Sequence, residues 1–241
     1  MKFSKAQIKE AIARDYPHYV NNLRNRGEKI QKDCFVRGTL AEIFLRDFLK
    51  SYDFIVQSNI SNNAEDIDLQ ISGLQFAEKN IAFDRPLNIE IKTSLIPYQS
   101  FDIYKSADLK IYKKTDDIQK DIVWDIGVQV YFNYYKKGWE NFIELSDEKT
   151  IETMYHHLEF SIFWITKNKA IQYSNAIANE KDKIWTFPNS FKQFWKCPLK
   201  IHHANIDDLI VCLLKSLIFQ KLIVQKKIHG QQDNFFKKIF G

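Results

Sequence analysis

The alternation of hydrophobic and polar positions predicts five strands in the middle of the chain. Three segments are short, rich in β-branched residues and bounded by Asn, Gly or Pro, as is typical of strands. They cover residues 53–60, 65–71 and 87–93. Two later segments, residues 121–135 and 158–167, add a fourth and a fifth strand. We therefore expect a sheet to occupy the centre of the molecule.

A helical period precedes these strands, in residues 34–52. Apolar residues recur there at helical spacing, which gives one broad apolar face that can pack on a sheet. They are Leu40, Ala41, Phe44, Leu45, Phe48 and Leu49. Residues 4–32 predict one or two short helices, and residues 106–121 predict another. A long last helix is expected to begin at Asn205, a good N-cap residue with Asp208 three positions later.

This order of elements is typical of an α/β domain with a mixed central sheet flanked by helices. A chain of 241 residues fits one domain with a large core, and its composition, 45% hydrophobic and 27% charged, is ordinary for a folded protein. We expect one compact unit. In it, residues 1–170 form the core with N-terminal helices, and residues 171–241 form an aromatic and helical C-terminal extension.

Composition also narrows the class of protein. The first ten residues carry charges and have no apolar core typical of a secretory signal. The longest apolar run, residues 209–214, is far shorter than the roughly 20 residues that span a bilayer. Cys34, Cys197 and Cys212 lack the spacing of a zinc site or an iron-sulfur cluster. We expect a cytoplasmic protein with reduced thiols and no membrane association.

The net charge of +5 is concentrated at the C-terminal end of the chain. Residues 215–241 carry six lysines and one aspartate, so the preceding residues are neutral in sum. Such a stretch suits a polyanion, although a solvated lysine-rich helix end gives the same pattern. Candidate contacts to nucleic acid are Lys226, Lys227, Lys237 and Lys238.

Two of the predicted strands carry charged residues at alternate positions. Because alternate side chains of a strand share a face, Asp66, Asp68 and Gln70 lie on one side of the first of these strands. Glu90 and Lys92 share one side of the second strand. If the two strands pair, Asp68 lies beside Glu90 and Lys92, about 5 Å apart at facing Cβ atoms. The aliphatic faces then anchor the strands while the opposite faces build a site.

Two carboxylates at such a distance repel each other unless a cation lies between them. Mg²⁺ is the natural occupant, because it takes oxygen ligands and binds through only one or two protein carboxylates, which leaves positions for water and phosphate. A lysine on the same face can orient or deprotonate the attacking water. The pattern therefore suits a Mg²⁺ site at which a lysine can act on water next to a phosphate.

The arrangement of Asp68 followed by Glu90-x-Lys92 resembles the PD-(D/E)xK nuclease superfamily, which has the restriction endonuclease-like fold. The preceding segment "GTLAEIFLRDFL", with Gly38 one turn from Glu42, looks like the helix of that family. The resemblance covers residues 34 to about 135. It implies Mg²⁺ bound by Asp68 and Glu90, with the Ile91 carbonyl as a further ligand, Lys92 assisting the water and Glu42 auxiliary.

Each of these residues also has a simpler interpretation. Asp66 competes with Asp68, although the family acid is usually the second of an Asp-x-Asp pair, and the proline of the literal motif is missing here. Asp68 and Lys92 are also compatible with the exposed edge of a sheet. Glu42 has the spacing for an ordinary helical ion pair with Arg46. Gln129 either reaches the site from the next strand or is a satisfied buried amide.

The remaining polar and aromatic clusters carry weaker signals. The six histidines have no metal-site spacing and are interpreted as structural or surface residues. Residues 183–196 interleave aromatic residues with lysines, which suits base stacking but is more typical of core packing. The final helix has more apolar positions than one face needs, which predicts a homodimer.

The function that the sequence favours is a Mg²⁺-dependent endonuclease that acts on double-stranded DNA. A type II restriction endonuclease or a related defence nuclease is expected, because no helicase, Walker A or methyltransferase motif accompanies the site. Two alternatives stay open. One is a structure-selective repair or recombination nuclease of the junction-resolvase kind, and the other is a DNA-binding module that kept the fold without the chemistry.

Overall fold

The computed structural model describes residues 1–14, 28–58, 67–76, 78–98, 100–135, 147–186 and 191–230. Its helices are α1 Lys5–Ala13, α2 Glu28–Lys50, α3 Ile103–Ser106, α4 Ile118–Asp121, α6 Asp147–His157, α7 Lys167–Ala176, α8 Glu180–Lys183, η1 Leu199–Ile201 and α9 Asp207–Gly230. Its strands are β1 Phe54–Ser58, β2 Leu69–Phe76, β3 Lys79–Ile96, β4 Asp108–Tyr112, β5 Ile126–Tyr135, β6 Phe160–Thr166, β7 Ile184–Thr186 and β8 Gln193–Pro198.

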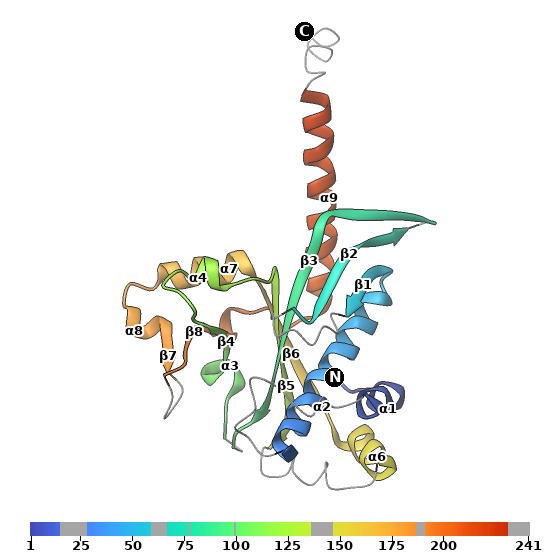
Figure 1. The fold of residues 1–241 in the computed structure, drawn as a ribbon, viewed down its shortest axis with the longest axis vertical. Helices are drawn as coiled ribbons and strands as arrows, with labels where there is room; N and C mark the ends of the chain where they lie inside the picture. Colours follow the sequence, from blue (N-terminus) through green and yellow to red (C-terminus); the bar gives the residue numbers. More distant parts are fainter. Residues whose placement is uncertain are drawn as a thin grey trace.

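A mixed five-stranded sheet in the order β1-β2-β3-β5-β6 forms the centre of the molecule (Figure 1). Strands β1, β2 and β3 form an antiparallel meander, β5 is parallel to β3, and β6 is antiparallel to β5. Helices flank this sheet, so the predicted α/β class is confirmed at this level. All five predicted strands are present, although β2 begins only at Leu69 and β3 begins eight residues earlier than predicted, at Lys79.

The main core joins helices α2 and α9 to this sheet. Helix α2 contributes Leu40, Ile43 and Leu49 with no exposed surface, and they pack with the inward-facing aliphatic residues of the strands. Complete burial of such a side chain stabilises the fold by about 1.5–3 kcal/mol. Helix α1 is held at its start by a capping box, in which Ser4 and Gln7 exchange hydrogen bonds of 3.2 and 3.0 Å.

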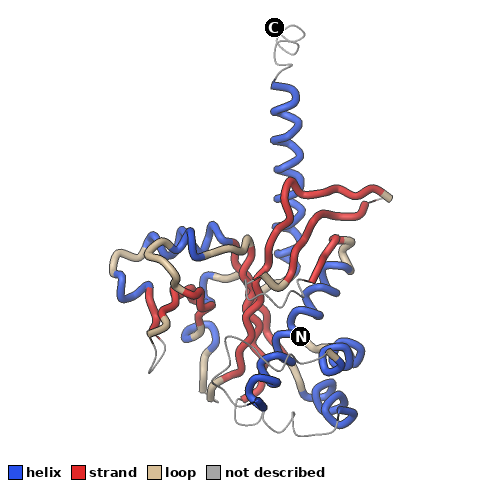
Figure 2. The backbone as a smooth tube through the Cα atoms, viewed as in Figure 1, coloured by secondary structure: helices blue, strands red, loops and turns tan. Residues whose placement is uncertain are grey.

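A second, three-stranded sheet in the order β4-β8-β7 lies beside the first (Figure 2). The helix predicted for residues 106–121 is therefore wrong, because most of that segment is strand β4 followed by the single turn α4. Leu109 and Ile111 are buried while Lys110 between them is exposed, which is the period of a strand. Strand β8, far along the sequence, supplies the hydrogen-bonding partner for β4.

The C-terminal region is less purely helical than predicted, because it contributes β7 and β8 to this second sheet. Helix α9 then begins after Asn205, whose side chain accepts a 3.0 Å hydrogen bond from the Asp207 amide. The helix extends beside the long β2–β3 hairpin (Figure 1), where Gln220 accepts a 3.0 Å hydrogen bond from the Asp84 amide. Within the described part of the chain, no helix is long and apolar enough to cross a membrane.

Candidate active site

Asp68 is positioned by two backbone groups of strand β3. Its own amide donates to the Ile89 carbonyl at 3.0 Å, and its Oδ2 accepts a 2.5 Å hydrogen bond from the Ile91 amide. Asp68 is the residue immediately before β2, at the point where the backbone pairing of β2 with β3 ends. The carboxylate thus replaces a backbone carbonyl as the partner of Ile91 and is fixed next to Glu90.

The predicted pairing of the two charged strands is confirmed. Leu69 pairs with Ile89, and both side chains are completely buried in the main core. Gln70 pairs with Asn88 on the opposite face, where the two amides share a 3.1 Å hydrogen bond. The polar positions of β2 and β3 therefore do share a face, and Asp68 lies at the end of that face.

Glu90 and Lys92 form an ion pair on this face of β3. The side chain of Glu90 is 11% exposed and that of Lys92 is 42% exposed, so the acid is covered while the ammonium group reaches solvent. A buried carboxylate needs a partner of opposite charge to stay ionised at low cost. Lys92 provides this charge, and it lies at the boundary between the covered acid and the solvent.

Strand β5 lies beside these residues on the other edge of β3. Lys92 pairs in register with Gln129, and Glu90 pairs with Gly127. The Gln129 amide is 2% exposed and donates to Ser94 Oγ at 3.2 Å and to the Val130 carbonyl at 3.3 Å. Gln129 thus lies beside Lys92 and is satisfied by protein groups. This arrangement combines the two interpretations that the sequence left open.

Gly127 allows the close approach of the polypeptide segments that surround β5. A Cβ atom at this position would lie 2.8 Å from Leu109 Cδ2 and 2.9 Å from the Trp124 ring. Both neighbours belong to the second core cluster, which packs under the three-stranded sheet. Because Gly127 has no side chain, β5 can pack closely against the second sheet at the position next to Glu90.

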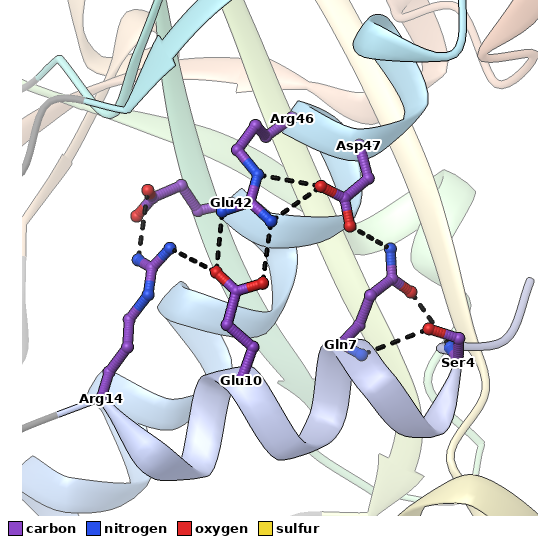
Figure 3. Close-up of polar contacts among 7 residues, drawn as sticks. All are labelled: Ser4, Gln7, Glu10, Arg14, Glu42, Arg46 and Asp47. Atoms are coloured by element: carbon purple, nitrogen blue, oxygen red, sulfur yellow. Dashed lines mark hydrogen bonds and ion pairs between the residues drawn. The ribbon is translucent and has the colours of Figure 1, made fainter.

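Glu42 belongs to a network of ion pairs between α1 and α2 (Figure 3). Its Oε1 accepts a 3.3 Å hydrogen bond from Arg14. Arg46 donates to both oxygens of Glu10, at 2.7 and 2.8 Å, and also to Asp47. The helical Glu42–Arg46 pair considered above is thus replaced by contacts across the helix interface, and the auxiliary role of Glu42 stays a prediction.

The same network changes the ionisation of its central acid. Hydrogen bonds from Arg46, above all, and from Arg14 lower the pKa of Glu10 to about 2. The Glu10 contact in turn raises the pKa of Arg46. The Glu10–Arg46 pair therefore stays ionised at neutral pH and links α1 to α2.

The described residues include no group of three or more His, Cys, Asp or Glu side chains arranged to hold a metal ion. Asp68 and Glu90 supply two carboxylates, which is the number that Mg²⁺ usually takes from a protein. These two carboxylates fit the oxygen ligands that Mg²⁺ prefers. The Ile91 carbonyl stays a predicted ligand.

Several predicted residues lie outside the described parts of the structure. Asp66, the competitor of Asp68, is one of them, and Lys237 and Lys238 are two others. Lys226 and Lys227 fall within α9, but their side chains are outside the described set. Their predicted contacts to nucleic acid stay predictions.

The aromatic residues of the C-terminal region divide between two roles. Trp195 is buried in the second core and donates a 2.8 Å hydrogen bond to Asp121, as the packing interpretation predicts. Trp185 and Phe194 instead line a pocket of about 500 Å³, and Phe191 is fully exposed. This pocket was missed in the sequence, although the alternation of β4 and β8 was a usable signal.

The histidines near the C-terminal region have structural contacts. His202 Nδ1 lies 3.0 Å from the Pro198 carbonyl, and burial lowers the pKa of His202 to about 4. His203 stacks on Trp164 with ring centroids 4.3 Å apart. For these two residues the structural interpretation agrees with the observed packing.

Comparison of the chain with protein-family models gave no match, and comparisons with curated proteins and with solved structures gave none either. The functional interpretation therefore depends on the geometry and chemistry of the site.

Proposed function

We propose that the protein is a Mg²⁺-dependent DNA endonuclease that hydrolyses phosphodiester bonds, of the type II restriction or a related defence class. One observation carries the proposal. The Asp68 carboxylate is bonded to the amide between Glu90 and Lys92, so all three predicted catalytic residues lie together at one point of the sheet. The resemblance of this pattern to the PD-(D/E)xK nucleases, and the meander followed by a parallel strand, give further support.

In the proposed mechanism, residues of the chain bind the metal ion, orient the attacking water and handle its proton. Asp68 and Glu90 would hold Mg²⁺, which when bound would supply Lewis-acid activation of the scissile phosphate and the attacking water. Lys92 orients that water and offsets the negative charge that grows on the phosphate oxygens. Gln129 and Ser94 restrict the strand on which Lys92 is carried.

The direct test is incubation of purified protein with supercoiled plasmid DNA in Mg²⁺, with EDTA as the control. We expect nicked and linear products that EDTA prevents. Discrete fragments with uniform sequenced ends would assign site-specific cleavage. Cleavage confined to branched DNA would assign the junction-resolvase alternative. Metal-independent DNA binding without any cleavage would overturn the proposal and leave a binding module.

The second part of the proposal is a homodimer. Ile218 and Phe219 of α9 are 58% and 65% exposed, and Val211 is 48% exposed, which is a large apolar area for a free helix. A dimer would present two active sites to the two strands of a symmetric site. Light scattering measures the molecular mass of the protein with and without DNA. A monomeric mass in both conditions would count against the homodimer.

A further inference from the structure

A pocket of about 500 Å³ begins at Lys92 and extends between the two sheets. Its walls come from the end of β3, the adjacent part of β5, and all three strands of the second sheet. Its lining includes Lys92, Ser94, Gln129, Lys110, Trp185 and Phe194. Its volume lies within the range of about 300–1,000 Å³ that is usual for small-molecule sites. The pocket thus shares one residue with the proposed active site.

The second sheet forms one wall of the pocket, and the alternation of side chains along its strands decides which residues face the pocket. In β4, Leu109 and Ile111 face the second core, so Asp108 and Lys110 face the opposite side. In the same way, Trp195 of β8 faces the core while Phe194 faces outward. Every strand of this small sheet therefore presents a charged or aromatic residue to the pocket side.

The aromatic groups of the wall are arranged around Trp185. The ammonium group of Lys110 lies 3.3 Å from the centroid of the Trp185 ring, and the Phe194 ring centroid lies 5.7 Å from it. Trp185 and Phe194 face each other in register between β7 and β8. The Lys110 ammonium group thus covers one face of the Trp185 ring, where its charge can attract a phosphate, and the other face is the one that can stack on a nucleobase.

The opposite wall supplies hydrogen-bonding groups. Ser94 Oγ and the Gln129 amide lie on β3 and β5, and the Tyr131 ring lies next to them. On the wall formed by the second sheet, Asp108 of β4 adds a carboxylate, with the positive charges of Lys196, Lys110 and Lys200 around it. Because Ser94 and Gln129 are hydrogen-bonded to each other, this wall gives the pocket a polar surface, and an unpaired base would be recognised mainly by stacking on the aromatic plane.

We propose that this pocket binds one unstacked nucleotide of the DNA strand that is held at Asp68, Glu90 and Lys92. This inference rests on the proposed endonuclease function and names the form in which the substrate is bound. A paired base cannot enter a pocket between two sheets, so the nucleotide must leave the base stack. Lys92 contacts the scissile region at the mouth of the pocket, and Trp185 stacks on the base inside it.

The test measures the affinity for two labelled DNA duplexes, one perfectly paired and one with a single bulged nucleotide, by fluorescence anisotropy. Ca²⁺ replaces Mg²⁺ so that the DNA stays intact. A bulged nucleotide is already unpaired, so the protein is spared the cost of extrusion. We expect the wild-type protein to bind the bulged duplex at least about 10-fold more tightly than the paired duplex.

Trp185→Ala should lower the affinity for the bulged duplex at least about 5-fold, because base stacking on an aromatic ring is lost. Trp185→Phe should retain most of that affinity, and Phe191→Ala is the matched control, because Phe191 is exposed and does not line the pocket. Lys110→Gln removes the cation over Trp185, at an exposed position. It should lower the affinity for both duplexes and flatten the salt dependence of that affinity. Circular dichroism checks the fold of each variant.

The outcomes separate this inference from the proposed function. Equal affinity of the wild-type protein for both duplexes, or wild-type affinities in Trp185→Ala and Lys110→Gln, would overturn the pocket assignment while plasmid cleavage still stands. Preferential, Trp185-dependent binding of the bulged duplex by a protein that never cleaves DNA would support the pocket and reject the endonuclease.

Discussion

The amide of Ile91 donates a 2.5 Å hydrogen bond to the carboxylate of Asp68. Ile91 lies between Glu90 and Lys92, so a single contact fixes the first acid relative to the other two members of the site. Since the bond uses the backbone of β3, its position does not depend on any other side chain.

Asp68→Ala and Glu90→Ala should each lower plasmid cleavage by several orders of magnitude, because each removes one of two carboxylates available to the ion. DNA binding without metal should survive or tighten, since a negative charge near the phosphate is lost. Cleavage rates and anisotropy in EDTA measure the two effects. Wild-type cleavage by either variant would place the metal elsewhere.

Lys92→Ala should lower cleavage about 10²- to 10⁴-fold, the usual contribution of a group that handles a proton. Metal-dependent DNA binding should remain measurable, because both carboxylates stay in place. Glu42→Ala is the control variant and should lower the cleavage rate less, since Glu42 is hydrogen-bonded to Arg14 in the helix interface. Asp66→Ala should likewise cost less than Asp68→Ala. A wild-type cleavage rate in a folded Lys92→Ala variant would refute the site.

Glu10→Gln should change how stability depends on pH. The pKa of Glu10 is lowered in the folded protein to about 2, so its ion pairs stabilise the fold fully above its unfolded pKa of about 4.5. This contribution is lost as the pH falls from about 4.5 towards about 2. The stability difference between wild type and Glu10→Gln should therefore shrink over this window.

Urea unfolding at several pH values measures this difference. Glu148→Gln, at an exposed position on α6, serves as the control and should show no comparable convergence with the wild type. A difference that stays constant down to about pH 2 would contradict the placement of Glu10 between Arg14 and Arg46.

Two glycine substitutions should have opposite effects on stability. Gly127→Ala puts a Cβ atom 2.8 Å from Leu109 and should destabilise the fold by about 1–3 kcal/mol. Gly38→Ala lies in α2, where no atom of the described residues beyond the helix's own backbone lies within 4 Å of the new Cβ, so it should stabilise the helix by about 0.5–1 kcal/mol. Denaturant unfolding measures the change in the free energy of unfolding for each variant. Changes of the same sign would contradict the packing around these two glycines.

The basic end of the chain gives a test that does not depend on catalysis. Replacing Lys226, Lys227, Lys237 and Lys238 with Ala should weaken binding to all DNA sequences alike. The salt dependence of the affinity should fall by about one unit of slope for each lysine that contacts a phosphate. An unchanged slope would show that these lysines are only solvated.

The five strands of the central sheet were predictable because the period of two fixes both the strand and the face on which each side chain lies. The same reasoning placed Asp68 with Glu90 and Lys92. Strand β4 was not predictable in this way, because its partner β8 lies far along the sequence and its short pattern also fits a helix. Pairing with the distant strand β8 makes residues 108–112 a strand instead of a helix.

The contacts of Glu42 were not predictable for a related reason. The spacing within α2 shows only what Glu42 can reach on its own helix. Glu10 lies in α1 and Arg14 is the C-cap residue of that helix, and the angle at which α1 crosses α2 depends on the packed core. The pocket was missed because its two walls belong to different sheets.

Strand β4 has a consequence for the newly made chain. During synthesis, β1, β2 and β3 can pair soon after they leave the ribosome, because each is close in sequence to its partner. Strand β4 must wait for β8, and at about 5–20 residues per second the delay lasts several seconds. Throughout that interval Leu109 and Ile111 lack the strand that completes their cover. The second sheet thus closes only when β8 has been made, and the main core is completed later still, when α9 follows.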